Sequence, residues 1–205
     1  MRVVISAALL IVMAMSAAAQ DCPSQCSADW VSGCSPIVIN FENGGYRLTG
    51  ADSPVTFDIA AAGQPVRIGW TAAGVDEAFL CLDRNGNGKI DNGAEMFGSS
   101  TPLKDGTRAP NGFVALAEFD DNHDGIIDER DAVWNRLLLW RDLNHDGISQ
   151  PNELAPVVGS GLTAISLDYH YTGRRDVSGN TFRYESQVWI PTPRPVYDIF
   201  FRRVP

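Results

Sequence analysis

Residues 120–131 read DDNHDGIIDERD and residues 142–153 read DLNHDGISQPNE, and the ten residues between them are AVWNRLLLWR. Both blocks have Asp or Asn at positions 1, 3 and 5, glycine at position 6 and an acid at position 12. Alternate residues can turn short oxygen-bearing side chains toward one point, glycine permits a sharp turn, and the last acid closes a shell of about six to eight oxygens around a hard cation. This spacing is that of an EF-hand calcium loop, so the sequence predicts two calcium sites.

The predicted ligands are the side chains at positions 1, 3, 5, 9 and 12 and the backbone carbonyl at position 7. Two Asx-rich turns on a solvated acidic surface are the alternative, because Asp and Asn side chains also stabilise turns without a metal. The tandem repeat, with an acid at position 12 in both copies, favours the metal interpretation. The first loop would use Asp120, Asn122, Asp124, Ile126, Asp128 and Asp131, and the second Asp142, Asn144, Asp146, Ile148, Gln150 and Glu153.

A third loop, DRNGNGKIDNGAE at residues 83–95, follows the apolar segment AFLCL. It has glycine at position 6, but position 12 is Ala94 and the acid comes one residue later, at Glu95. Two of its early side chains are neutral, so we expect weaker calcium binding than in the other two loops. An Asx/Gly turn without metal is the alternative. The predicted ligands are Asp83, Asn85, Asn87, Asp91, Glu95 and the carbonyl of Lys89.

The N-terminus has the composition of a secretory signal peptide. Arg2 precedes an apolar run at residues 3–15, and three alanines at residues 17–19 form a small-residue cleavage site. The run is shorter than the roughly 20 residues of a membrane-spanning helix. We therefore expect residues 1–19 to be removed before Gln20 and the mature chain, without a membrane span, to be secreted or periplasmic. A retained N-terminal anchor is the alternative.

Negative charge is concentrated around the predicted calcium loops. The formal net charge of the chain is −9, and residues 76–153 alone hold 16 acidic and 7 basic residues, whereas residues 161–205 hold 4 acidic and 6 basic ones. Without bound cations the carboxylates of the acidic segment would repel one another. No basic stripe runs along the sequence, so nucleic acid is excluded as an expected partner.

The four cysteines are Cys22, Cys26, Cys34 and Cys81. An even number of cysteines in an exported chain predicts two disulfides, and the sequence leaves their connectivity open. If all four pair, at least one bond joins the N-terminal cluster to Cys81. We therefore expect residues 20–35 to be an irregular, disulfide-tied lead-in.

The rest of the chain, residues 36–205, predicts one calcium-binding domain with an α+β fold. An N-terminal meander of short strands (36–82) leads through the calcium turn (83–95) to an EF-hand-like calcium-loop helical pair (112–158) and C-terminal strands that include a β-hairpin (162–201). Helices are predicted at residues 112–119, 129–141 and 152–158. Strands are predicted at residues 36–41, 46–48, 55–59, 65–70, 78–82, 162–171, 181–190 and 196–201, with a stiff extended link at 191–195.

The predicted helix at residues 129–141 is too apolar to be exposed. Val133, Leu137 and Trp140 would lie on one stripe, with Trp134 and Leu138 beside it. Packing into the core is the main interpretation, and a partner-binding face around the two tryptophans is the alternative.

Four blocks carry a resemblance to a known group of proteins: LDRNGNGKIDNGAEMFG, NGFVALAEFDDNHDGIID, LLLWRDLNHDGISQPNEL and GLTAISLDY. They resemble secreted bacterial EF-hand-type calcium-binding proteins and C-terminal regions of large RTX-like and adhesin-like exoproteins. The paired loops are also similar to the dockerin frame, from which the longer apolar spacer and the flanking strands depart. The resemblance covers about residues 35–201 and implies calcium as the ligand, but it does not imply a pathway.

These observations predict a secreted protein in which calcium ions (Ca²⁺) stabilise the fold. A calcium-dependent docking or adhesion module, with an extracellular or envelope protein as its partner, is the first alternative. A secreted hydrolase with structural calcium ranks last, because the sequence has no GxSxG or HExxH motif and no recognisable Cys/His pair. We therefore expect that the chain is not an enzyme.

Overall fold

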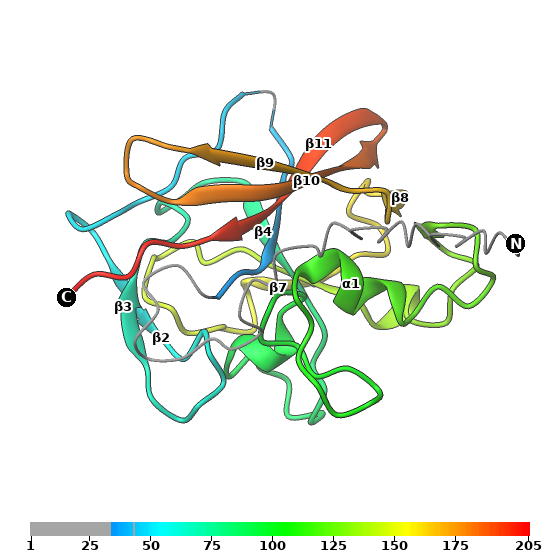
Figure 1. The fold of residues 1–205 in the computed structure, drawn as a ribbon, viewed down its shortest axis with the longest axis horizontal. Helices are drawn as coiled ribbons and strands as arrows, with labels where there is room; N and C mark the ends of the chain where they lie inside the picture. The colour runs from blue at the N-terminus through cyan, green and yellow to red at the C-terminus, as the bar shows by residue number, and fades with distance from the viewer. Residues whose placement is uncertain (1–33, 43) are drawn as a thin grey trace, which may run out of the picture.

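Strands dominate the computed structural model, which describes residues 34–42 and 44–205 (Figure 1). The short helical elements are α1 (Gly112–Ala117) and the 3-10 turns η1 (Gly93–Glu95) and η2 (Trp134–Arg136). The strands are β1 (Ile37–Asn40), β2 (Val55–Phe57), β3 (Val66–Ile68), β4 (Glu77–Cys81), β5 (Ile126–Ile127), β6 (Leu138–Trp140), β7 (Leu154–Pro156), β8 (Ala164–Ser166), β9 (His170–Arg175), β10 (Thr181–Ile190) and β11 (Thr192–Phe200).

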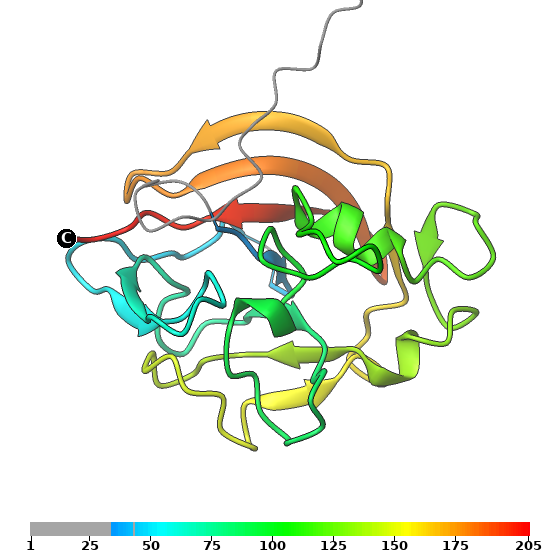
Figure 2. The ribbon, with the colours of Figure 1, turned by 60° about the horizontal axis from the view of Figure 1, so that its bottom comes forward.

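Nine of these strands form one sheet in the order β5-β8-β10-β11-β1-β4-β6-β7, with β9 paired to β10 off this path. The other two, β2 and β3, form a separate hairpin. All the pairings are antiparallel. The large sheet curls into a half-barrel, in which β9, β10 and β11 form one wall and β6 and β7 the opposite one (Figure 2).

The central strands bury side chains on both faces of the sheet. In β4, Ala78 and Leu80 belong to one hydrophobic cluster, whereas Phe79 and Cys81 belong to the other. A strand that is buried on both faces is apolar along its whole length and shows no alternation of polar and apolar residues. The sequence of such a strand therefore does not indicate its register.

The helix α1 packs closely against the sheet. Asn111 caps its first turn through its side chain. A Cβ atom on Gly112 would lie 2.5 Å from the Ile37 side chain and 2.6 Å from the Phe97 carbonyl oxygen, so glycine is required for this approach. The N–H of Gly112 donates a 2.9 Å hydrogen bond to Oδ2 of Asp198 in β11, which fixes the start of the helix to the centre of the sheet.

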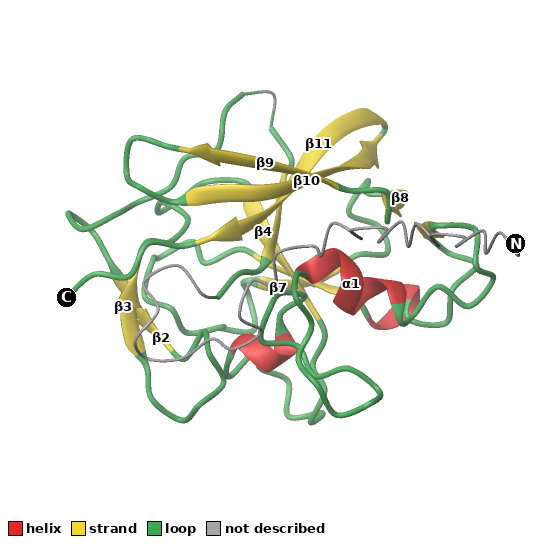
Figure 3. Ribbon diagram, in the orientation of Figure 1, coloured by secondary structure: helices red, strands yellow, loops and turns green. Residues whose placement is uncertain are grey.

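The predicted α+β fold with an EF-hand-like helical pair is wrong, because the described chain is nearly all antiparallel β-sheet with one short α-helix (Figure 3). Residues 129–141 hold only η2 and β6, and residues 152–158 hold β7. β6 pairs with β4 on one side and β7 on the other, so its backbone hydrogen bonds are made within the sheet. The apolar residues of β6 are buried on both faces of the sheet, so they do not form the apolar stripe of an amphipathic helix. Trp134 and Trp140 are both buried, so they do not form the alternative partner-binding face.

The predicted strands are partly present. Residues 181–190 form β10, as predicted, but residues 36–82 are not one meander, because β1 and β4 join the large sheet while β2 and β3 do not. Residues 162–171 contain β8 and the start of β9. Residues 191–195, predicted to be a link, largely belong to β11. Its prolines, Pro193 and Pro195, precede the residues that pair with β1, so they pair on one side only, where the missing N–H groups are tolerated.

The predicted pair of disulfides is also wrong. Cys81 is a free, buried thiol, and no disulfide joins two described residues. Cys34 is itself disulfide-bonded, whereas Cys22 and Cys26 lie outside the described residues. The predicted signal peptide and most of the predicted lead-in lie outside them as well. Within residues 34–42 and 44–205, no helix has the length and apolar character needed to cross a membrane.

Asp198 is a buried acid in the middle of the sheet. Its side chain is fully buried, and Oδ1 has no hydrogen-bond partner among the described residues. Desolvation by burial raises the pKa of Asp198 to about 6, against the opposing effects of hydrogen bonds from Ser35 and Gly112. Because the folded-state pKa lies above the unfolded value, this group contributes most stability below about pH 4, and that contribution is lost as the pH rises through about 6.

We therefore expect Asp198→Asn, which keeps a neutral side chain, to remove this pH dependence. The difference in free energy of unfolding between the variant and the parent chain should grow between pH 4 and pH 7 in favour of the variant, by up to about 3 kcal/mol. Denaturant unfolding across this range measures the difference. Asp168→Asn, at an exposed position, serves as the control. Parallel stability curves for Asp198→Asn and the parent would contradict the prediction.

Candidate functional site

The three predicted calcium loops are present as irregular turns, and none of them lies between two α-helices. Residues 83–95 follow β4, and residues 142–153 connect β6 to β7. Residues 120–131 follow α1 and contain β5. The prediction of EF-hands is therefore wrong in its flanking elements.

The three loops nevertheless share one backbone conformation. The glycines at position 6, Gly88, Gly125 and Gly147, all have positive φ values of 73–79°. Position 4 is also left-handed in each loop, at Gly86 with φ 73°, His123 with φ 58° and His145 with φ 63°. The left-handed residues at positions 4 and 6 reverse the direction of the chain sharply.

The acid at position 1 holds each turn together by accepting backbone N–H groups. Asp120 accepts from Asp124 at 3.2 Å and from Gly125 at 2.9 Å. Asp142 accepts from the equivalent residues, Asp146 and Gly147, at 3.1 and 2.8 Å. The equivalent acid of the third loop, Asp83, accepts from Gly86, Asn87 and Gly88.

The closing acid crosses each loop from the other end. Glu153 Oε1 accepts from the N–H groups of Leu143 and Asn144, and its Oε2 accepts from Gln150. Asp131 likewise accepts from positions 2 and 9 of its own loop.

Glu95 makes the same contacts as Glu153, although it lies one residue later in its loop. Its Oε1 accepts from Arg84 and Asn85, and its Oε2 accepts from Asp91. These three donors stand at positions 2, 3 and 9, so Glu95 reaches back across the turn to backbone N–H groups, while its role as a calcium ligand stays a prediction.

The loop at residues 142–153 is joined to the hydrophobic core by hydrogen bonds from two tryptophans. The indole N–H of Trp70 donates a buried 2.8 Å hydrogen bond to Oδ2 of Asp142, and that of Trp140 donates to Oε2 of Glu153 at 3.4 Å. The two indole rings contact each other edge to face, with centroids 5.6 Å apart. Asp142 and Glu153 are only 2% and 4% exposed. The aromatic core therefore positions the first and last acids of this loop.

Within the described part of the chain, the acids of this loop, Asp142, Asp146 and Glu153, form no ion pair with a basic side chain. The side-chain amide of Gln150 donates to Asp146 at 2.8 Å, while its carbonyl oxygen is buried with no hydrogen-bond partner among the described residues. Together with the carboxylates and the backbone carbonyl of the loop, amide oxygens of this kind make up the donor set that a hard cation takes.

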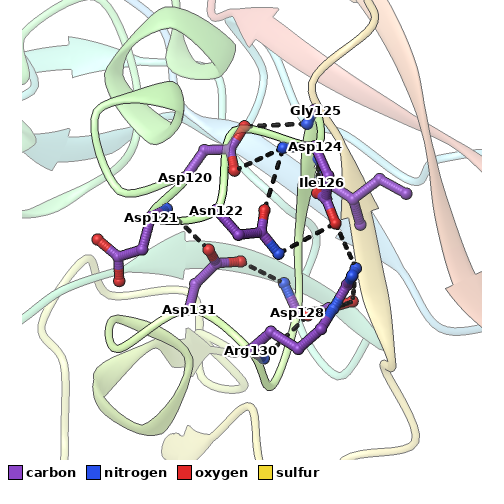
Figure 4. A network of polar contacts seen from close by, with 9 residues as sticks. All are labelled: Asp120, Asp121, Asn122, Asp124, Gly125, Ile126, Asp128, Arg130 and Asp131. Carbon is purple, nitrogen blue, oxygen red and sulfur yellow. Dashed lines mark hydrogen bonds and ion pairs between the residues drawn. The ribbon is translucent and has the colours of Figure 1, made fainter.

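The loop at residues 120–131 differs because it contains its own cation. The guanidinium group of Arg130 contacts Asp124 Oδ2 at 2.6 Å and Asp128 Oδ2 at 2.7 Å (Figure 4). These acids occupy positions 5 and 9 of the loop. Hydrogen bonds from Arg130 lower the pKa of Asp128, which keeps this acid ionised. Sequence reasoning missed Arg130, although its position within the loop could have drawn attention to it.

In the loop at residues 83–95, side-chain amides surround one carboxylate oxygen. Asn85 and Asn87 both donate to Asp91 Oδ2, at 3.1 and 2.7 Å. Residues 85–89 and Asp91 are exposed, but Glu95 is buried. The side chains that donate to the Asp91 carboxylate are neutral amides, in agreement with the lower negative charge of this loop in the sequence.

The sequence predicted that the acids of each loop converge on a single point, but they do not. Among the described residues, no group of three or more His, Cys, Asp or Glu side chains is placed to hold a metal ion. The acids at positions 1 and 12 face backbone N–H groups instead. The predicted EF-hand metal-binding groups are therefore not found among the described residues. The loops also contain amide and backbone carbonyl oxygens, which calcium can bind but which do not belong to His, Cys, Asp or Glu side chains.

Comparison with known proteins places the chain in a family. The SPM domain family matches residues 37–201. The chain is also similar to the iron-regulated protein FrpA of Neisseria meningitidis serogroup C, with 40% identity over 148 residues. This match covers 71% of the chain but only 13% of FrpA, so the chain corresponds to a small part of that protein.

The family match corrects the resemblance to EF-hand-type proteins and dockerins, because it spans the whole described β-sheet and α1 and includes all three loops. The shared loop spacing had suggested a helical family, whereas the loops here belong to a domain that is mostly antiparallel β-sheet. The chain belongs to the SPM domain family.

Proposed function

We propose that this chain is an exported protein whose β domain binds calcium through its Asx-rich loops and is stabilised by the bound ions. One observation carries the proposal: in the loop at residues 142–153, Asp142 and Glu153 are buried and have no ion-pair partner among the described residues, and the side-chain oxygen of Gln150 is buried with no donor among them. The similarity to FrpA and the N-terminal signal-like sequence support export.

The buried acids of this loop carry negative charge that is costly to remove from water. A carboxylate removed from water is strongly destabilising unless it is paired or hydrogen-bonded. Asp142 and Glu153 accept hydrogen bonds from backbone and indole N–H groups, but these dipoles do not neutralise two negative charges. A divalent cation supplies that charge and accepts amide and carbonyl oxygens together with carboxylates.

The residues that would hold the ion in this loop are Asp142, Asn144, Asp146, Gln150 and Glu153, together with the carbonyl of Ile148. Asn144 and Gln150 now direct their amide N–H groups at Asp146, so their side chains would turn to present oxygen. Such a change is small, because the two ends of a side-chain amide have nearly the same shape. The backbone frame of the loop would not need to change.

Calcium in this arrangement would act as a structural element. Extracellular calcium modules bind with dissociation constants of about 10⁻⁴–10⁻³ M, which suits a site that is filled outside the cell. An ion that binds only the folded chain adds stability by mass action, about 2.7 kcal/mol at a hundredfold excess over the dissociation constant. An extracellular protein partner and the absence of enzymatic activity stay predictions, which a pull-down with and without chelator and an activity screen would test.

Isothermal titration calorimetry of the full chain with calcium tests the proposal. Asp142→Ala should remove one bound ion from the isotherm and reduce the gain in thermal stability that calcium gives, because it removes the acid at position 1 of the most buried loop. Asp168→Ala makes the same change of charge at an exposed position and should leave both quantities unaltered. An unchanged isotherm for Asp142→Ala, or no heat of binding for the parent chain, would refute the assignment.

Arg130 should weaken calcium binding in the loop at residues 120–131, because its guanidinium group occupies Asp124 and Asp128 and repels a divalent ion. We expect Arg130→Ala to tighten calcium binding at this loop by about 2- to 5-fold, the scale of an exposed ion pair. Arg136→Ala, which removes the same charge from a side chain outside the ion pairs of the described chain, is the control. Equal affinities for the two variants would contradict a competing role for Arg130.

A further inference from the structure

Two loops that are far apart in the sequence touch through a buried contact. The hydroxyl of Ser149 accepts a 2.8 Å hydrogen bond from the N–H of Ile90 and donates one of 3.3 Å to the carbonyl oxygen of the same residue. Ser149 and Ile90 are only 3% and 2% exposed. One side chain therefore satisfies both polar backbone groups of Ile90, away from water.

The contact joins equivalent positions in the two loops. Ile90 is the eighth residue of the loop at 83–95, and Ser149 is the eighth residue of the loop at 142–153. In each loop, position 8 lies between the carbonyl at position 7 and the side chain at position 9, which are both predicted ligands. A shift of either loop at this point would move ligand groups in the other.

The hairpin strand β2 and the residues after it support both loops from behind. The N–H of Gly93 donates a 2.9 Å hydrogen bond to the carbonyl oxygen of Asp58. A Cβ atom on Gly147 would lie 2.4 Å from the side chain of Val55 and 3.1 Å from the carbonyl oxygen of Thr56. The two loops thus share one rigid backing as well as the direct contact.

The third loop is connected differently. Its eighth residue, Ile127, belongs to β5 and pairs with Ile165 in β8. The N–H of Leu167, just after β8, donates to the carbonyl of Gly125. The loop at residues 120–131 is therefore fixed to the opposite end of the sheet order, although it precedes the loop at 142–153 directly in the sequence.

We infer that the loops at 83–95 and 142–153 bind calcium as a coupled pair through Ser149, while the loop at 120–131 binds independently. The inference rests on the proposed calcium function and adds its regulation. An ion in one loop orders position 8 of that loop and, through the Ser149–Ile90 contact, positions the ligand groups of the other. Binding at either loop then increases the affinity of the other by the same factor.

Trp70 and Trp140 provide a local reporter for this test, because their indole N–H groups donate to Asp142 and Glu153. Their indole resonances in ¹⁵N-labelled full-length chain, assigned with Trp→Phe variants, give the calcium affinity of the loop at 142–153 alone. Asp83→Ala disables the other member of the pair and should lower this affinity by about 5-fold or more, the range of typical coupling between sites. Asp120→Ala disables the independent loop and should leave it unchanged.

Ser149→Ala should abolish the coupling, so that adding Asp83→Ala to it no longer changes the affinity measured at the indoles. Ser149→Thr, which keeps the hydroxyl, should retain the effect of Asp83→Ala. If Ser149→Ala does not fold, the comparison of Asp83→Ala with Asp120→Ala in the parent chain decides the question. Equal effects of these two, or full coupling in Ser149→Ala, would overturn the coupled pair while leaving calcium binding intact. Indole resonances that do not respond to calcium in the parent chain would instead refute the proposed function and, with it, the coupling.

Discussion

The buried hydrogen bond between the Trp70 indole and the Asp142 carboxylate is the interaction on which this account depends. It joins an aromatic core to an acidic loop at a distance of 2.8 Å, away from solvent. Trp70 also contacts Phe79 and Trp140, which lie on neighbouring strands of the central sheet. Loop and core therefore cannot be treated separately, because a change in the charge of the loop acts directly on the packing of the sheet.

The pairing of β6 with β7 explains how a loop of this spacing can keep its conformation without a helix at either end. In an EF-hand, two helices hold the ends of the loop, whereas here β6 and β7 leave and re-enter an antiparallel sheet on either side of residues 142–153. The strands fix the separation of the first and last acids, and the indoles fix their orientation. The local hydrogen bonds from the acids to backbone N–H groups then depend on the loop sequence alone, so they recur in all three loops despite different surroundings.

The sequence was informative where interactions are local and misleading where they are not. The Asp, Asn and Gly spacing located all three turns and their closing acids, because the contacts within each turn span only a few residues. The helix predicted at residues 129–141 is absent, because β6 satisfies its backbone by pairing with β4, far away in the sequence. For the same reason, the sequence did not indicate the roles of Trp70 and Ser149, whose hydrogen-bond partners lie 72 and 59 residues away along the chain. Nothing in the spacing of either residue indicates a partner at that distance.

Membership of the SPM domain family and the small share of FrpA that the chain matches place the three loops within a module that also occurs in a much larger protein. The most direct test of the account is diffraction from crystals grown with calcium, with anomalous differences used to locate the ions. The account predicts a peak enclosed by Asp142, Asp146, Gln150 and Glu153, with the side-chain oxygen of Gln150 turned toward it. A map without a peak in this loop, at a calcium concentration of several millimolar, would contradict the central claim.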